Sequence, residues 1–130
     1  MDNTGLRGLA ARHYVDAHIS VGKKMTLDDY QRDALRTVNG EPQLAMVALG
    51  LTGESGEFAD IVKKHLFHGH DLDKDKAIKE LGDVLWYVAV AAKTLGVSLE
   101  DVAQINVDKL RKRYPDGFAQ NRSINRDEEK

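Results

Sequence analysis

The sequence predicts an all-α fold, a helical bundle of four to five helices. Apolar residues recur at helical spacing along most of the 130-residue chain, and no segment shows the sustained alternation of a β-strand. Capping and helix-breaking residues divide the chain into segments of helical length. A chain of this length can bury a hydrophobic core in one domain without disulfide bonds.

The first helix of the main domain is predicted to begin after Thr26. Asp29, three residues later, completes a pattern similar to a capping box, with an acid where Glu or Gln is usual. The helix is predicted over residues 27–38 and ends at the Asn-Gly pair that follows. Residues 1–24 form an N-terminal extension, in which apolar residues at helical spacing allow a short helix.

The second and third helices are the longest of the predicted elements. The second covers residues 42–65, with Pro42 in the first turn, where a helix tolerates proline. A polar loop at residues 68–73 separates it from the third helix, residues 74–95. Gly96 follows as a suitable C-terminal stop.

Ser98 and Asp101 open a fourth helix over residues 99–113, again in capping positions. Pro115 prevents this helix from continuing easily. Residues 119–130 are nearly all polar or charged, and this tail is predicted to be poorly ordered.

Composition excludes several classes of protein. Without cysteine, the chain has no disulfide, thiolate zinc site or cysteine nucleophile. A net charge of -2 gives no broad argument for binding nucleic acid or an anionic membrane. The longest apolar run, residues 84–92, is too short to cross a bilayer, and the N-terminus lacks the apolar core of a signal peptide. We therefore expect a cytoplasmic protein without nucleic-acid or membrane partners.

Two predicted helices each carry two acids three residues apart, Glu54 with Glu57 and Glu80 with Asp83. Side chains at this spacing lie on the same face of a helix. Glu54 falls in the middle of the apolar stripe of its helix, and Glu57 lies at the edge of that stripe. The other helix is apolar around nearly its whole circumference between residues 81 and 95, so we expect it to be buried on most sides. Glu54, Glu80 and Asp83 should then face protein more than water.

Carboxylates in such surroundings need a compensating charge. Removing an ionised carboxylate from water costs several kcal/mol unless it is paired, and four together repel one another. Nearby lysines are one solution, and a divalent cation is another. Oxygen ligands without histidine favour Mg²⁺ or Mn²⁺. Because Mg²⁺ retains waters and prefers partners with phosphate oxygens, the second solution indicates a phosphorylated substrate.

The acids lie in motifs that resemble those of a known family. The segments GESGE (residues 53–57) and KELGDVLWY (residues 79–87) are similar to the E-x-x-E and E-x-x-D signature of the MazG-like nucleotide pyrophosphohydrolases, in the all-α NTP pyrophosphatase superfamily. The Tyr-Gln pair at 30–31 and the segment N-x-x-K-L-x-x-R-Y-P-x-G-F (residues 106–118) extend this resemblance. It covers roughly residues 25–118, which we expect to form one MazG-like domain.

This resemblance implies a reaction in which a nucleoside triphosphate and water give the monophosphate and pyrophosphate. It implies Mg²⁺ held by the same four acids, Glu54, Glu57, Glu80 and Asp83, with Mn²⁺ as an alternative. One carboxylate that the metal does not fully engage would orient or deprotonate the attacking water. The resemblance also implies a homodimer or homotetramer, and the apolar third helix likewise argues against an isolated monomer. A role in house-cleaning of the nucleotide pool follows by analogy with the family alone.

Three residues of the fourth helix are candidates for binding substrate. Lys109 and Arg113 are four residues apart on one face and can grip phosphate oxygens. Asn106, one turn before Lys109, can donate a hydrogen bond to the substrate. A simple surface charge is the other interpretation of the Lys-Arg pair.

Two other functions remain open. Phosphoribosyl-ATP pyrophosphohydrolases share the scaffold, so a related activity on that substrate is one alternative. The other is a catalytically silent helical module that oligomerises or binds a partner, with its acids satisfied by lysines.

Several further residues have a structural and a functional interpretation. His65, His68 and His70 lack an obvious fourth ligand, so a solvated or substrate-adjacent loop is favoured over a metal site. Trp86 and Tyr87 are predicted to serve the core or a subunit contact rather than to stack on a base. The glycines at 50, 53 and 56 are predicted to allow close approach of a neighbouring helix or of substrate.

Overall fold

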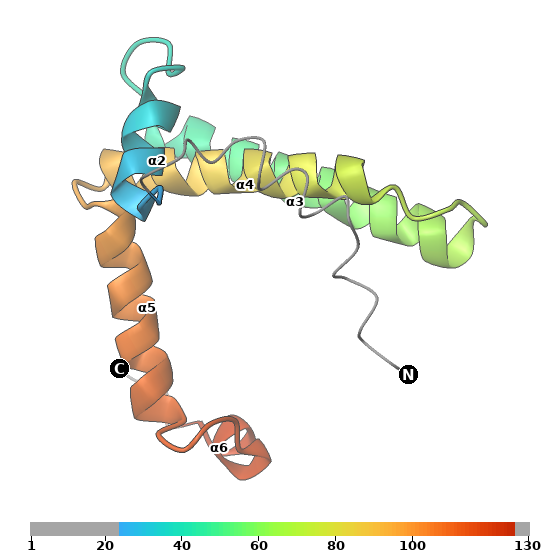
Figure 1. Cartoon of the computed structure of the whole chain (residues 1–130), viewed down its shortest axis with the longest axis vertical. Helices are drawn as coiled ribbons and strands as arrows, with labels where there is room; N and C mark the ends of the chain where they lie inside the picture. The colour runs from blue at the N-terminus through green and yellow to red at the C-terminus, as the bar shows by residue number, and fades with distance from the viewer. Residues whose placement is uncertain (1–23, 127–130) are drawn as a thin grey trace.

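The computed structural model describes residues 24–126, and this part of the chain contains five α-helices (Figure 1). In chain order they are α2 (Leu27–Leu35), α3 (Leu44–Phe67), α4 (Lys74–Thr94), α5 (Leu99–Arg113) and α6 (Gln120–Ile124). The described residues contain no strand, and their one β feature is an isolated bridge between Pro115 and Gly117. The predicted all-α fold class is confirmed. The predicted N-terminal extension lies outside the described residues except for Lys24.

Helices α3 and α4 lie side by side as a long antiparallel hairpin (Figure 1). Val47 and Ile61 of α3 and Val90 of α4 are buried between or beside them. Gly50 is required for their close approach, because a Cβ atom at this position would overlap the ring of Tyr87. The prediction of close approach is therefore confirmed at Gly50, whereas a Cβ atom at Gly53 or Gly56 would meet no described atom within 4 Å, so no described helix of the same chain approaches there.

A small core forms where α2 crosses the end of the hairpin. Ala34 of α2, Ala89 of α4 and Leu99 of α5 are buried together, with Tyr30 and Trp86 packed against them. The indole nitrogen of Trp86 donates hydrogen bonds to a hydroxyl and a carbonyl on the α2 side of this core. Trp86 therefore belongs to the core, as predicted.

Most helix boundaries follow the predicted signals. Thr26 with Asp29, and Ser98 with Asp101, each form a reciprocal capping box. Gly96 ends α4 with a φ of 79°, in the left-handed region that glycine favours.

Three elements differ from the prediction. Helix α3 begins at Leu44 and ends at Phe67, so Pro42 precedes the helix instead of lying in its first turn. Helix α2 ends three residues earlier than predicted, in a turn where the hydroxyl of Thr37 donates to the carbonyl of Ala34 (2.8 Å). Helix α6, residues Gln120–Ile124, lies in the tail for which the sequence predicts no order. The side chain of Ser123 in this helix hydrogen-bonds to the Tyr114 hydroxyl, which lowers the pKa of Tyr114 and joins α6 to the end of α5.

The prediction that α4 is buried on most sides is wrong for a single chain. Its buried residues are confined to its C-terminal half, where α2 and α5 meet it, and Leu81 remains 50% exposed. The reason is the direction of α5, which leaves α4 at a bend of 98° instead of packing along it (Figure 1). Among the described residues no single helix is long and apolar enough to cross a membrane, although α4 and α5 together pass that test as a bent pair.

Candidate metal centre

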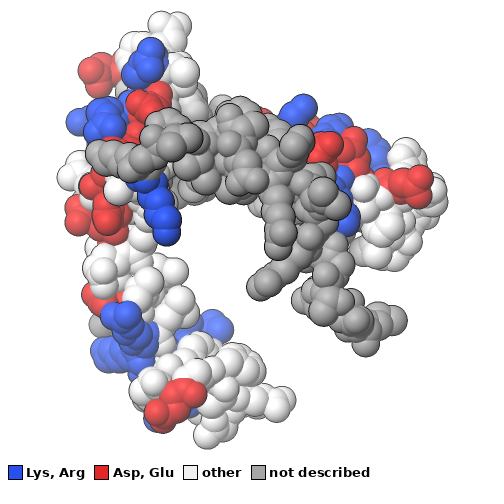
Figure 2. All heavy atoms as spheres, viewed as in Figure 1, with Lys and Arg blue, Asp and Glu red and all other residues white. Residues whose placement is uncertain are grey.

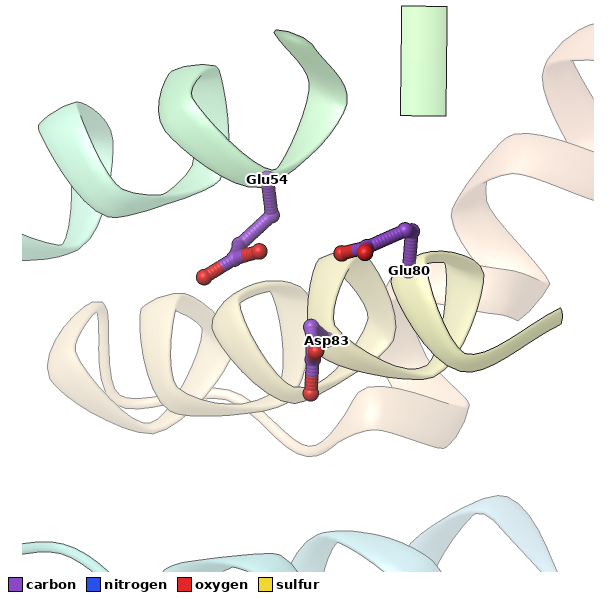
Figure 3. A group of neighbouring side chains, drawn as sticks. All are labelled: Glu54, Glu80 and Asp83. Atoms are coloured by element: carbon purple, nitrogen blue, oxygen red, sulfur yellow. The ribbon is translucent and has the colours of Figure 1, made fainter. Parts of the chain in front are cut away.

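Three carboxylates from α3 and α4 meet in the middle of the hairpin. One carboxylate oxygen from each of Glu54, Glu80 and Asp83 lies within 4.8 Å of the other two. Figure 3 shows Glu54 extending from α3 toward α4, and Glu80 extending from α4 toward Glu54. Residues far apart in the sequence therefore form one cluster.

The packing of Gly50 against Tyr87 explains why these acids meet. In an antiparallel pair, one turn forward from Gly50 on α3 corresponds to one turn back from Tyr87 on α4. This step brings Glu54 opposite Asp83 and leaves Glu80 one turn further along the same face of α4. The close contact at Gly50 also shortens the distance that the carboxylates must span.

The cluster is partly open to solvent. Glu54 and Glu80 are half-buried and Asp83 is exposed, so the prediction that these acids face protein more than water is wrong for Asp83 in a single chain. The cause is again the uncovered N-terminal half of α4, which α5 does not reach. Solvent lowers the cost of the negative charges and leaves the centre accessible to an ion and to a ligand.

Negative charge accumulates at Glu54. Burial raises the pKa of this carboxyl above its usual value, and the charges of Asp83, Glu80 and Glu57 raise it further. In the part of the chain that the structure describes, no lysine or arginine forms an ion pair with any of these four acids. Among the described residues, the three clustered acids therefore have no cationic partner in direct contact, and Lys64 interacts with Glu57 only at longer range.

The nearest lysines on α3 are paired elsewhere. Lys63 and Lys64 each lie 2.6 Å from a carboxylate oxygen of Asp60. Their hydrogen bonds lower the pKa of Asp60 to about 2. This arrangement argues against the alternative in which these lysines neutralise the acid cluster.

Glu57, the fourth predicted acid, is exposed and lies outside the group of three. It is one turn from Glu54 on the same helix, and its charge still contributes to the raised pKa of Glu54. Glu57 therefore lies beside the cluster along α3, but its exposed side chain is not part of it.

The donor set fits a hard divalent cation. All of its donors are carboxylate oxygens, and no histidine of the described residues joins the group. Ligand oxygens around one octahedral Mg²⁺ lie about 3 to 4 Å apart, which small side-chain rotations can reach from the observed separation. The histidine loop has no comparable geometry, since the described contact there is His65 Nδ1 with the carbonyl oxygen of His70 (2.9 Å).

Tyr30 of α2 is a residue of the centre for which the sequence suggested no role. Burial raises the pKa of its hydroxyl, and the charge of Asp83 raises it further, so the phenol lies within electrostatic reach of that acid. Tyr30 stands next to Gln31 in the family-like pair, but nothing in the local pattern indicated that α2 would pack beside the acids.

The predicted substrate-binding residues lie apart from the acids of the same chain. Asn106 and Lys109 line an open, largely apolar hollow of about 470 Å³ between α2, α4 and α5, and Arg113 lies beyond it. Leu85 of α4 also lines this hollow, and it is about 200° around the helix from Asp83. The C-terminal end of α5 is far from the hairpin centre in Figure 1, and Figure 2 shows lysine and arginine side chains gathered over that end.

Comparison with known proteins agrees with this geometry. The family model of the MazG nucleotide pyrophosphohydrolase domain matches residues 43–118. The chain belongs to this family. The matched range contains all three clustered acids and Glu57, as well as the substrate-binding candidates on α5, while α2 lies before it.

Individual proteins are similar to this chain in sequence or in fold. The Gene 37 protein of Mycobacterium phage L5 is 42% identical over 87 residues, which are 64% of this chain and 76% of that protein. The uncharacterized protein YvdC of Bacillus subtilis (strain 168) is 46% identical over 41 residues, 32% of this chain and 39% of that protein. The crystal structure of iMazG from Vibrio DAT 722 has the same fold, with a TM-score of 0.53 and 24% identity over 69% of this chain and 98% of that chain.

Proposed function

We propose that this protein hydrolyses a nucleoside triphosphate to the monophosphate and pyrophosphate, with Mg²⁺ held by Glu54, Glu80 and Asp83. The observation that carries this proposal is the convergence of three carboxylates within 4.8 Å, without a cationic side chain paired to them among the described residues. Membership of the MazG family supports the reaction class.

The residues of the centre have complementary roles in this proposal. When bound, Mg²⁺ or Mn²⁺ supplies charge neutralisation at the phosphates and polarises the phosphorus that is attacked. Glu57, whose side chain lies outside the cluster, is the carboxylate best placed to orient a water molecule and accept its proton. The attack would break the bond between the α-phosphorus and the oxygen that bridges it to the β-phosphorus.

We propose that Asn106, Lys109 and Arg113 bind the substrate in an assembled dimer or tetramer. These residues lie away from the acids of their own chain, and the uncovered half of α4 leaves large apolar side chains in solvent. Exposed apolar surface of this kind is typical of a protein contact. A second chain that covers α4 would bring its own α5 toward these acids.

The test is pyrophosphate release from a panel of nucleoside triphosphates, with Mg²⁺, with Mn²⁺ and with EDTA. We expect turnover that requires the metal and is lost in Glu54→Gln and Asp83→Asn. Asp75→Asn, an exposed acid in the first turn of α4, is the matched control and should retain turnover.

The two alternatives give different results in the same assay. A phosphoribosyl-ATP pyrophosphohydrolase would release pyrophosphate from that substrate in preference to the common nucleotides. A silent oligomerisation module would turn over none of them, and acid-to-amide changes would be neutral or stabilising. A house-cleaning role requires that damaged or non-canonical nucleotides have a higher kcat/KM than the canonical ones.

The contribution of a second chain has its own test. Mixing Asp83→Asn chains with Lys109→Ala chains allows a hybrid site that has intact acids from one chain and an intact α5 from the other. We expect such mixtures to recover part of the lost activity if the two sets act across an interface. Activity that never exceeds the sum of the separate variants would show that each chain completes its own site.

A further inference from the structure

Gln31 connects three segments of the chain through one side-chain amide. It is the one buried polar residue in the described part of the molecule, at 7% exposure. Its Nε2 donates to the carbonyl of Ala89 in α4 (3.0 Å) and to that of Val97 in the corner after α4 (3.4 Å), and its Oε1 accepts from the backbone N–H of Leu99 at the start of α5 (3.1 Å). Both donors and one acceptor position of the amide are therefore used.

A second residue of α2 completes this attachment. Asp28, one turn before Gln31, accepts from the backbone N–H of Glu100 (3.1 Å). The hydroxyl of Ser98 accepts from the next N–H, that of Asp101 (3.0 Å). The first three N–H groups of α5 have no partner inside their own helix, and two of the three are satisfied by α2.

This attachment is made at the corner where the chain turns by 98° from α4 into α5. The corner is short, and Gly96 in it has a left-handed φ of 79°. Gln31 holds both arms of the corner, because it bonds α4 on one side and the first residue of α5 on the other. Its amide therefore limits how far α5 can rotate relative to α4.

Small rotations at this corner have large effects at the other end of α5. Lys109 and Arg113 follow Leu99 by ten and fourteen residues, which is about 15 and 21 Å along a helix. A rotation of about 10° would move them by roughly 3 and 4 Å. Displacements of this size move a side chain out of hydrogen-bond distance of a phosphate oxygen, which weakens nucleotide binding.

We infer that Gln31, assisted by Asp28, is a positioning residue that sets the α4–α5 angle and thereby places the substrate-binding side chains of α5 relative to the metal centre. This role rests on the proposed function, because it assumes that Asn106, Lys109 and Arg113 contact the nucleotide. A residue that only stabilises the fold could be replaced without changing the angle between α4 and α5 in the folded protein.

The angle can be measured without any enzyme assay. Because the chain has no cysteine, Lys79→Cys on α4 and Arg111→Cys on α5 give two specific sites for spin labels. Labelled chains are diluted with unlabelled ones so that the distance within one chain is read. We expect Gln31→Met to broaden this distance distribution or shift its mean by about 3 Å or more, and Gln104→Met on the exposed face of α5 to leave it unchanged.

Unlabelled variants test the consequence for the reaction. We expect Gln31→Met to raise KM for the nucleotide about tenfold or more, with kcat changed by less than about threefold. Mn²⁺ affinity without nucleotide should be unchanged, because its ligands lie on α3 and α4. An unchanged distance distribution, or an unchanged KM in a folded variant, would overturn the inference, and so would equal losses of Mn²⁺ binding and kcat.

Further variants keep the test decisive. If Gln31→Met fails to fold, Asp28→Ala removes the other, partly exposed hydrogen bond between α2 and α5. We expect it to change the spin-label distance and KM in the same direction as Gln31→Met, but less. If neither quantity changes, the inference is overturned. If the wild-type protein turns over no nucleotide, the proposed function fails. The distance measurement then still decides whether Gln31 sets the angle.

Discussion

The two acid pairs have the same kind of spacing and different surroundings. Glu80 and Asp83 of α4 both join the cluster, whereas on α3 only Glu54 joins it and Glu57 remains exposed. The i, i+3 spacing places two carboxylates on one face of a helix, but each side chain reaches the centre only if the neighbouring helix is close at that turn. The comparison separates three acids that lie together from one that does not, and these are the residues to which we assign metal binding and water activation.

The largest effect should come from the members of the cluster. We expect Asp83→Asn to lower kcat/KM for pyrophosphate release on the order of 10³-fold and to weaken Mn²⁺ binding, because a neutral amide no longer attracts the ion. Titration of Mn²⁺ by electron paramagnetic resonance and pyrophosphate detection measure the two effects. Turnover like that of the Asp75→Asn control would remove the cluster from the mechanism.

Glu57→Gln should show whether the acid pair on α3 differs in role from the acid pair on α4. If Glu57 acts on the attacking water, this change lowers kcat about 10²-fold and leaves Mn²⁺ affinity close to that of the wild type. The same two measurements apply. A loss of Mn²⁺ binding as large as that of Asp83→Asn would mean that Glu57 turns inward and is a ligand, so that the two pairs are equivalent.

Changes at two glycines test the contact that brings the pairs together. Gly50→Ala forces a methyl group into the Tyr87 ring, and we expect a net destabilisation of about 1 to 2 kcal/mol after the gain in helix propensity is subtracted. Gly53→Ala meets no described atom within 4 Å and should stabilise the helix by up to about 1 kcal/mol. Urea unfolding measures both, and equal effects would contradict the assigned contact.

The smallest effect should be the pH dependence of the metal-free protein. Since the pKa of Glu54 is raised on folding, its ionisation destabilises the folded chain as pH rises past the ordinary value of 4.5. Glu54→Gln should therefore have a higher Tm than the wild type at pH 7 without metal, and the difference should shrink as pH falls through the raised pKa toward 4.5 and stay constant below it. If the Tm difference between the two proteins grew at low pH instead, the charge of Glu54 would stabilise the folded chain, contrary to this prediction. Metal should also bind the wild type less tightly as Glu54 becomes protonated.

Sequence signals between neighbouring residues determined where most helices of this protein begin and end. They also identified the acids from which the cluster is built. The capping boxes at Thr26 and Ser98 and the stop at Gly96 act through neighbouring residues, so the sequence was sufficient to place these boundaries. The i, i+3 pairs likewise depend on helix geometry alone, and the resemblance to the MazG family followed from their order. The early end of α2 and the presence of α6 depend on contacts that local patterns do not contain.

Tertiary structure alone decided which acids meet and where α5 points. The contact of Gly50 with Tyr87 sets the register of α3 against α4, and the amide of Gln31 holds α5 at the corner. Each of these two contacts joins residues more than 30 positions apart. Helical periodicity shows which face of a helix is apolar, but it does not show which distant residue will pack against that face. For the same physical reason the apolar circumference of α4 predicted burial, while the chain by itself leaves half of that helix uncovered.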